Sequence, residues 1–326
     1  MKDILDGISV IGIMGLAKNA GKTTTLNKII EIYPELRIGL TSIGLDGEPL
    51  DQVNFLPKPA IWVRPNMMVA TAKTCLDASN VAWKLMNQTK YMTPLGPIMM
   101  VEILSAGTMM IAGPTTNLEL SNIVLEMKKH CEKILIDGAF NRMTFSSIHV
   151  MEGVVLASGA SYHDELDETL RHTQDLINLF SAPQTSYLIS EKIAISIFSG
   201  HEVFTYSDKR LDTLEQMIVK CKQPIQALYV RGALTSKVMD ILIESNLNNC
   251  VLIIDDPSKW MASQRHFRAL SHYNIQLEVV RSFPILMVTI NPFNPHGMPY
   301  DEQEMMKRFK SAIQVPIFNV KEEYNG

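Results

Sequence analysis

The chain has 326 residues, of which 46% are hydrophobic and 20% charged, and its formal net charge is −4. This supplies a sizeable core, in one large α/β domain or in two smaller ones. The near balance of acidic and basic residues argues against nucleic acid or an acidic membrane surface as a partner. Apolar runs are too short to span a bilayer, and the start of the chain lacks a signal-peptide layout. With four widely spaced cysteines, we expect reduced thiols and a cytoplasmic protein.

The first predicted elements enclose a glycine-bounded loop. The apolar run Ile8–Met14 predicts a strand, and the pattern over Lys22–Ile32 predicts a helix. Between them, residues 15–24 read Gly-Leu-Ala-Lys-Asn-Ala-Gly-Lys-Thr-Thr. A strand, a turn ending in Gly-Lys-Thr and a helix form the layout of a phosphate-binding P-loop, where backbone N–H groups and the helix dipole bind phosphate oxygens. The alternative is a chance Gly-Lys-Thr in an ordinary turn, which the flanking elements disfavour.

The residue types of this loop predict a site for a nucleoside triphosphate and Mg²⁺. Lys22 is expected to reach the β- and γ-phosphates and to act in catalysis, and the Thr23 hydroxyl is expected to bind Mg²⁺. Nucleotide contacts are expected from the residues that line the loop, namely Gly15, Asn19, Ala20, Gly21, Lys22, Thr23 and Thr24. The sequence therefore predicts a protein that binds a nucleoside triphosphate.

The loop is one residue longer than the standard P-loop motif, with five residues, Leu16 to Ala20, between Gly15 and Gly21. In this it resembles dethiobiotin synthetase and the class of P-loop proteins that includes the nitrogenase iron protein, MinD-type ATPases and metallochaperone GTPases. That class has members with a second lysine in the loop, and Lys18 is similar to it, although it lies one position later than in the MinD-type pattern. The resemblance implies a catalytic role for Lys18, in the same chain or across a homodimer.

Acidic residues follow the next predicted strand, Arg37–Ile43. In the resembled class, an aspartate shortly after this strand contacts Mg²⁺ or positions the attacking water. Asp46 is the best candidate for this metal-binding and catalytic role, and Glu48 is the second. Each is equally compatible with an ordinary turn acid.

The segment 57–113 is rich in short β-like runs. These runs are 60–64, 84–90, 97–104 and 108–111, and a helical pattern occurs only near 71–77. They predict hairpins or an inserted subsheet over the nucleotide site.

A second acidic position follows the helix predicted over Asn117–His130. The strand Lys133–Ile136 ends in Asp137 and Gly138, which is typical of a Walker-B strand whose acid holds the Mg²⁺ shell beside the P-loop. The alternative is a strand-end turn acid, for which Asp-Gly is common.

Alternating strands and helices continue to the end of the chain. The β-rich piece Lys192–Tyr206 predicts a boundary between a nucleotide-binding half, 1–190, and a C-terminal α/β half, 191–326, which belongs to the same sheet or forms a second domain. The whole pattern predicts an α/β fold with a doubly wound, mostly parallel sheet.

The C-terminal strand Ile285–Ile290 is followed by Asn291 and Pro292. This resembles the strand of the P-loop class whose terminal asparagine reads the base, and the amide of Asn291 offers the donor and acceptor for it. An asparagine before proline is also a plain turn former. No Asn-Lys-x-Asp guanine signature is present, so ATP is favoured over GTP.

A narrower resemblance covers four segments: 15–25, 41–48, 135–142 and 289–292. They are similar to the reactivase subunits that accompany B12-dependent aminomutases acting on lysine or ornithine. The resemblance implies an ATP-dependent factor that exchanges damaged cobalamin for fresh cofactor, beside a second ATPase subunit.

Three kinds of function remain open from the sequence. The first is an ATPase that acts on a protein partner and turns over slowly alone. The second is a ligase or kinase of the dethiobiotin synthetase kind, against which the segment 41–44 lacks that enzyme's substrate-binding lysine. The third is a nucleotide-dependent binding module without significant turnover.

Overall fold

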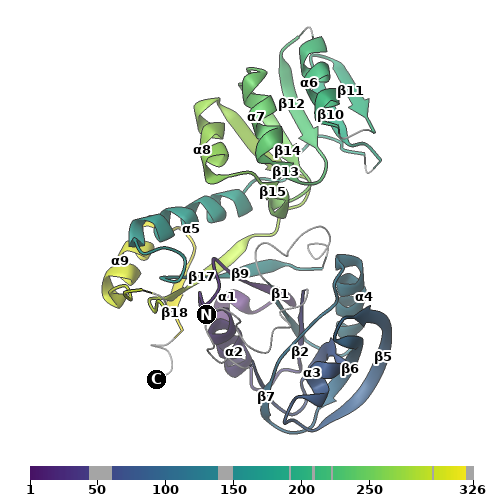
Figure 1. The fold of residues 1–326 in the computed structure, drawn as a ribbon, viewed down its shortest axis with the longest axis vertical. Coiled ribbons are helices and arrows are strands. Elements are labelled where there is room, and N and C mark those ends of the chain that lie inside the picture. The colour runs from purple at the N-terminus through teal and green to yellow at the C-terminus, as the bar shows by residue number, and fades with distance from the viewer. Residues whose placement is uncertain are drawn as a thin grey trace. The chain divides into compact units, whose positions relative to one another are not determined.

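The computed structural model describes residues 1–43, 61–138, 150–190, 192–207, 210–221, 223–295 and 297–320. The chain divides into two compact units, shown in Figure 1. Unit 1 comprises Met1–Thr173 together with Ile285–Gly326, and unit 2 comprises Gln174–Pro284. This differs from the predicted boundary at residue 190. Unit 2 is an insertion, and the last strands of the chain return to the sheet of unit 1.

The described residues of unit 1 contain a nine-stranded, mostly parallel sheet. Neighbouring strands from β18 to β4 are parallel, and only β6 and β5, at the far edge, run antiparallel to their neighbours. This agrees with the predicted α/β class. The strands, in spatial order, are β18 (Ile317–Asn319), β17 (Ile285–Asn291), β9 (Gly153–Gly159), β1 (Val10–Gly15), β8 (Lys133–Asp137), β2 (Ile38–Ser42), β4 (Met68–Ala72), β6 (Gly96–Ile103) and β5 (Trp83–Thr93).

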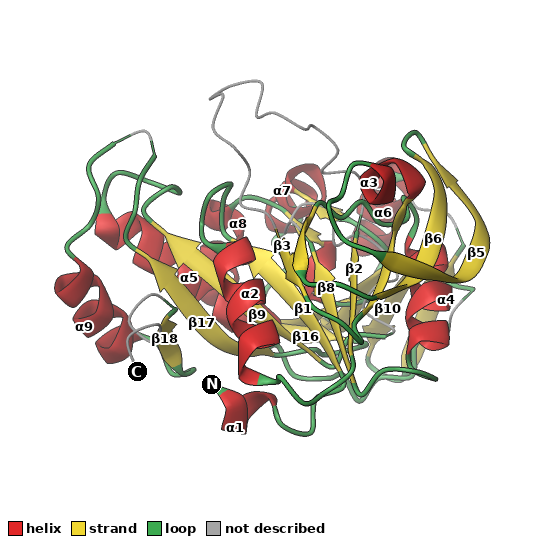
Figure 2. Ribbon diagram, turned by 90° about the horizontal axis from the view of Figure 1, so that it is seen from below, coloured by secondary structure: helices red, strands yellow, loops and turns green. Residues whose placement is uncertain are grey.

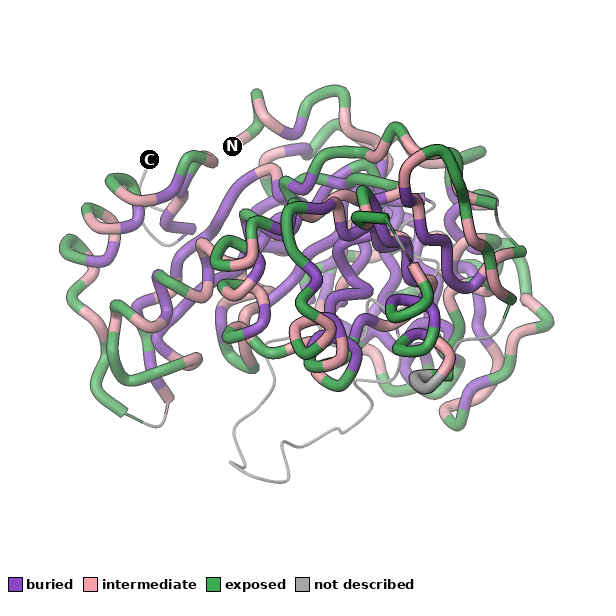
Figure 3. The backbone as a smooth tube through the Cα atoms, turned by 90° about the horizontal axis from the view of Figure 1, so that it is seen from above, coloured by how far each residue is buried: buried purple, intermediate pink, exposed green. Residues whose placement is uncertain are grey.

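Helix α2 (Lys22–Ile32) packs on one face of this sheet, over β1, β8 and β9 (Figure 2). Its apolar side, including Leu26 and Ile29, is buried with Ile11 and Ile13 of β1. Figure 3 shows the same pattern for the described residues, with buried segments toward the inside and exposed ones along the outside. The helices of unit 1 are α1 (Lys2–Leu5), α2 (Lys22–Ile32), α3 (Lys73–Asp77), α4 (Asn117–Met127) and α9 (Glu302–Ala312), while α5 (Leu166–Phe180) begins in unit 1 and ends in unit 2.

The β-rich segment forms the hairpin β5–β6, which is the first of the two expected arrangements, but most of its described strands belong to the central sheet and not to an inserted subsheet. Its strand β4 pairs in parallel with β2, and the hairpin β5–β6 continues from β4, so most of the segment extends the central sheet. The cause is β4 itself, which is buried along its whole length and therefore occupies an interior position. Only the short strands β3 (Ile61–Val63) and β7 (Gly107–Met109) pair apart from the central sheet.

Unit 2 has its own sheet, in the order β11-β10-β12-β14-β16. Strands β12, β14 and β16 are parallel, and β10 is antiparallel to both of its neighbours. The described helices of the two units include none that is long and apolar enough to cross a bilayer. The elements of unit 2 are β10 (Ile195–Ser199), β11 (Glu202–Tyr206), α6 (Leu211–Lys220), β12 (Ile225–Val230), β13 (Leu234–Thr235), α7 (Ser236–Glu244), β14 (Cys250–Ile254), the short 3₁₀ helix η3 (Pro257–Lys259), β15 (Trp260–Met261), α8 (Gln264–His272) and β16 (Ile275–Val279).

Candidate functional site

The loop between β1 and α2 lies at the carboxyl end of the central strands of unit 1. The Leu16 amide donates a hydrogen bond to the Ala157 carbonyl oxygen of β9 at 2.8 Å, which fixes the start of the loop. Asn19 and Gly21 have positive φ angles of 62° and 101°, a conformation that asparagine tolerates and glycine adopts freely. Helix α2 begins directly after Gly21 and has no side-chain cap. Its first amide groups therefore have no side-chain cap, as is common at helix starts that bind phosphate in other proteins.

Close backbone approach explains two glycines around this loop. A Cβ atom on Gly159, at the end of β9, would lie 2.5 Å from the carbonyl oxygen of Asn291. A Cβ atom on Gly21 would lie 3.3 Å from the Asn291 Cβ atom, in a backbone conformation that already disfavours other residues. The loop and the ends of β9 and β17 therefore meet at one place.

The predicted Walker-A lysine and Walker-B acid come together in the structure. The Lys22 Nζ atom lies 3.6 Å from Asp137 Oδ1, and the two side chains are only 17% and 18% exposed. The register of β1 against β8 places Ile13 beside Asp137, so Asp137 ends its strand beside the loop. The stem of Lys22 runs across Gly15, where a Cβ atom would lie 2.7 Å from Lys22 Cγ. A cation and a carboxylate thus share one sheltered position at the start of α2.

The oxygen donors near Lys22 fit Mg²⁺ better than a softer metal. Thr23, half-buried in the first turn of α2, offers a hydroxyl, and Asp137 offers a carboxylate. Mg²⁺ prefers hard oxygen ligands and keeps few of them from the protein when phosphates and water supply the rest. Among the described residues there is no cluster of three or more His, Cys, Asp or Glu side chains that would hold an ion without such help. Asp46 and Glu48 lie outside the described residues.

The remaining predicted residues surround this position. Ala20 is buried, Thr24 is half-buried in the first turn of α2, and Lys18 is exposed on the loop. The catalytic role expected for Lys18, in the same chain or in a homodimer, stays a prediction.

Asn291 contacts the P-loop rather than standing apart from it. Its Nδ2 atom donates a hydrogen bond to the Asn19 carbonyl oxygen at 3.0 Å. Its Oδ1 atom accepts a hydrogen bond from the Phe293 amide at 3.3 Å. Both ends of the amide are thus engaged within the protein, and recognition of the base by this side chain stays a prediction.

Two buried hydroxyls, which the sequence motifs did not indicate, join α2 to β17. The Thr25 and Thr289 Oγ1 atoms lie 2.7 Å apart, and the Thr25 hydroxyl also donates to the Gly21 carbonyl oxygen at 3.0 Å. Both residues are fully or almost fully buried. A threonine inside the apolar strand Ile285–Asn291 was the available signal. The pair fixes the helix start against the strand that ends in Asn291.

The segment that follows β7 reaches the site from its other side. The Gly113 amide donates to Ser42 Oγ at 2.7 Å, and a Cβ atom on Gly113 would lie 1.8 Å from the Ser42 carbonyl oxygen. Ser42 is paired with Asp137 in the register of β2 against β8. The β-rich segment therefore contacts the strand next to the candidate metal ligand.

A glycine-bearing segment, Arg231-Gly232-Ala233, directly follows β12 in unit 2. There the Asp255 carboxylate accepts hydrogen bonds from the Tyr229 hydroxyl at 2.6 Å and from the Gly232 amide at 2.7 Å. Burial and the bonded, charged Asp255 raise the pKa of Tyr229 well above its ordinary value. These contacts fix the end of β12 to the end of β14.

Candidate residues for phosphate and Mg²⁺ binding thus converge at one end of the unit 1 sheet. Comparisons of the chain with known protein families, with curated proteins and with solved structures found no match.

Proposed function

We propose that this protein is a P-loop ATPase that binds Mg-ATP and acts on a protein partner. The observation that supports this best is the 3.6 Å approach of Lys22 to Asp137 at the uncapped start of α2. The flanking strand, loop and helix, within a mostly parallel sheet, support the P-loop form of the α/β fold. In this proposal the sheet is doubly wound, as in the P-loop class.

Each residue would have a separate task in this site. The amide groups of the loop and of the first turn of α2 would bind phosphate oxygens. Lys22 would place its positive charge against the β- and γ-phosphates, where negative charge grows during phosphoryl transfer. Thr23 and Asp137 would hold Mg²⁺, which neutralises phosphate charge when bound. Asp46 would add a metal contact or orient the attacking water.

The proposed output is a change in a partner protein. The described residues around the P-loop offer backbone, hydroxyl and single charged groups, which are means of holding a nucleotide. Phosphoryl transfer depends mainly on positioning and charge, and a partner often completes the charge. The partner we propose is a B12-dependent aminomutase that is reactivated with fresh cofactor, in the cytoplasm and together with a second ATPase subunit. Lys18 would supply the additional positive charge that stabilises the transferring phosphoryl group, in the same chain or in a homodimer.

Titration calorimetry with the Lys22→Ala variant tests the nucleotide site. Loss of a hydrogen-bonded charge costs about 1.5–3 kcal/mol, so Mg-ATP should bind roughly ten- to hundredfold more weakly. The control is Lys307→Ala, which removes an exposed lysine of α9 in the same unit. Equal ATP affinity in the Lys22 variant and the parent would reject the proposal.

Phosphate release tests the partner. The purified protein alone should hydrolyse ATP slowly, and a damaged aminomutase should both accelerate hydrolysis and regain activity with Mg-ATP and fresh adenosylcobalamin. Rapid ATP-dependent turnover of a small acid or amine by the protein alone would place it among the ligases instead.

A further inference from the structure

Strand β5 is the outermost strand of the unit 1 sheet. It pairs with β6 on one side, and the order of the described strands ends with it. It has 11 residues, more than any other described strand. An edge strand carries backbone N–H and C=O groups that another strand can bind, and for this reason most edge strands are short. The length of β5 therefore offers an extended surface for strand addition.

The side chains of β5 are largely exposed and carry one sign of charge. Leu85 and Met92 are 45% and 66% exposed. Lys84 and Lys90 are also exposed, and the strand Trp83–Thr93 contains no carboxylate. A strand that paired with β5 would thus meet apolar groups and two positive charges, which acidic side chains complement.

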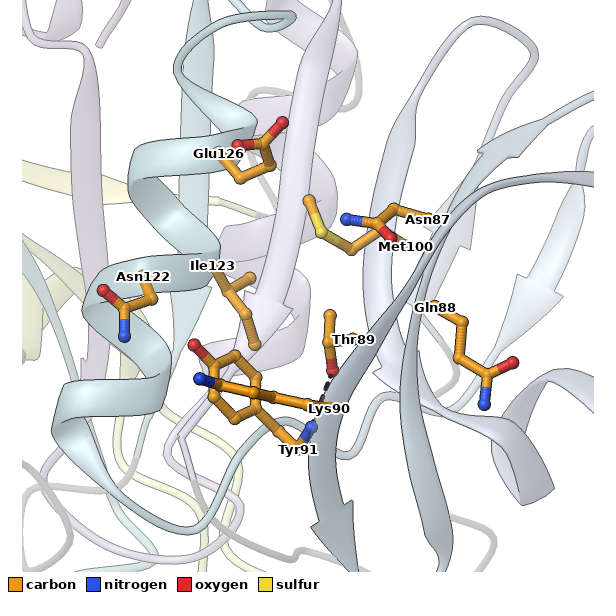
Figure 4. A pocket seen from close by; sticks show the side chains of 9 residues that line it. All are labelled: Asn87, Gln88, Thr89, Lys90, Tyr91, Met100, Asn122, Ile123 and Glu126. Atoms are coloured by element: carbon orange, nitrogen blue, oxygen red, sulfur yellow. Dashed lines mark hydrogen bonds between the residues drawn. The ribbon is translucent and has the colours of Figure 1, made fainter.

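A hollow of about 360 Å³ lies between β5 and α4, beside this edge. Figure 4 shows Lys90 and Tyr91 extending from the strand toward α4, from which Asn122, Ile123 and Glu126 also line the hollow. Glu126 forms an ion pair with Lys129 of the same helix, with 2.5 Å between the Nζ and Oε2 atoms. The hollow is lined by the charged side chains of Lys90 and Glu126, by uncharged polar groups and by the apolar side chains of Met100 and Ile123.

Strand β5 is irregular where it lines this hollow. The register with β6 shifts between Gln88 and Met92. There the Thr89 hydroxyl donates to the Ile98 carbonyl oxygen at 2.9 Å and accepts from the Tyr91 amide at 3.2 Å. A side chain thus replaces part of the backbone ladder, as occurs in bulges near functional sites.

We propose that β5 binds an extended, acidic segment of the protein partner as an added strand, with one of its side chains in the hollow. This inference rests on the proposed function for the existence of a partner, and it names the surface that the partner contacts. The backbone of β5 would supply affinity, and Lys84 and Lys90 would select acidic side chains. Three strand pairings connect this edge to the nucleotide site, because β5, β6, β4 and β2 are successive neighbours in the sheet. Strand β2 ends at Ser42, beside the strand that carries Asp137.

The probe for this surface is a synthetic peptide of alternating glutamate and valine, as long as β5, with a lysine–valine peptide for comparison. Fluorescence anisotropy with the full chain should show preferred binding of the glutamate peptide. Reversal of both charges, in Lys84→Glu with Lys90→Glu, should weaken that binding about tenfold and favour the lysine peptide. The matched control is Lys307→Glu, at an exposed lysine of α9, which should leave the preference unchanged.

Hydrogen exchange measures the protection of β5, and sedimentation measures the oligomeric state of the protein. Bound glutamate peptide should protect the amides of β5, and circular dichroism should show that all variants are folded. No peptide binding, or binding that ignores the charge reversal, would overturn the proposal. Protection of β5 by dimer formation without peptide would also overturn it, because a second copy would then occupy the edge. The Lys22→Ala variant should bind the peptide like the parent, which separates failure here from failure of the nucleotide site.

Discussion

The Asn291 side chain at the end of β17 donates a hydrogen bond to the carbonyl oxygen of Asn19 in the P-loop, at 3.0 Å. Asn19 has a φ of 62°, so this bond stabilises a backbone conformation that few residues adopt. The shape of the loop thus depends on a strand that joins the sheet from the far end of the sequence.

Replacement of Asn291 by alanine should weaken nucleotide binding through the loop. Loss of one neutral hydrogen bond costs about 0.5–1.5 kcal/mol, so ATP and GTP should both bind roughly two- to tenfold more weakly. Competition calorimetry with both nucleotides measures this, with Asn122→Ala on α4 as the control. The parent should prefer ATP modestly. If the variant loses affinity for ATP alone, Asn291 reads the base.

The Asp137→Asn variant should impair the Mg²⁺-dependent step while leaving nucleotide binding without metal unchanged. Asparagine keeps the shape of the side chain but removes the charge that would hold Mg²⁺ and that now lies 3.6 Å from Lys22. ATP binding with a chelator present should be retained, whereas Mg-dependent hydrolysis should fall at least about tenfold. Hydrolysis at the parental rate would remove Asp137 from the metal site.

Gly113→Ala should lower the free energy of unfolding. The new Cβ atom would lie 1.8 Å from the Ser42 carbonyl oxygen, so backbone has to move. Such overpacking costs about 1–3 kcal/mol. Urea unfolding measures it against Gly12→Ala, whose Cβ atom would meet the flexible side chain of Met151 at 2.6 Å and should cost less. Equal stability of the Gly113 variant and the parent would contradict this packing.

The buried thiol of Cys250 should make stability fall at high pH. Burial raises its pKa from 9.0 to about 11, so the folded protein holds the proton more tightly than the unfolded chain does. The resulting stability, up to about 3 kcal/mol, is fully present below the unfolded pKa and is lost as the pH rises through the folded pKa. In Cys250→Val, the free energy of unfolding should fall less steeply between these two values. Cys221→Val, at a less buried thiol, should resemble the parent.

Elements with strong local signals could be predicted from the sequence. The predicted bounds of α2, Lys22–Ile32, match the structure, because the helical periodicity of the segment is local to it. Strand β4 was missed, because its methionine and alanines favour helix in isolation and only pairing with β2 and β6 makes it a strand. The domain boundary failed for a similar reason, since the pairing of β17 with β9 is not local.

In the candidate site, too, contacts announced by local motifs could be predicted, and contacts between distant segments could not. The proximity of Lys22 and Asp137 was expected from two short motifs, each with its own strand. The bonds of Thr25 to Thr289 and of Gly113 to Ser42 were not, because they join atoms from distant segments. Asp46 lies outside the described residues, so its role stays a prediction.

The insertion of unit 2 has a consequence for how the chain folds during synthesis. Strand β9, at Gly153–Gly159, is flanked in the finished sheet by β1 and β17, yet all of unit 2 is translated before β17 emerges from the ribosome. Until then, one side of an entirely buried strand has no partner, and such an open edge invites aggregation. Rapid folding of unit 2 would bring the ends of the gap together and speed the pairing of β17 with β9 once β17 has emerged. Synonymous codons that slow translation before Ile285 should therefore reduce the soluble yield.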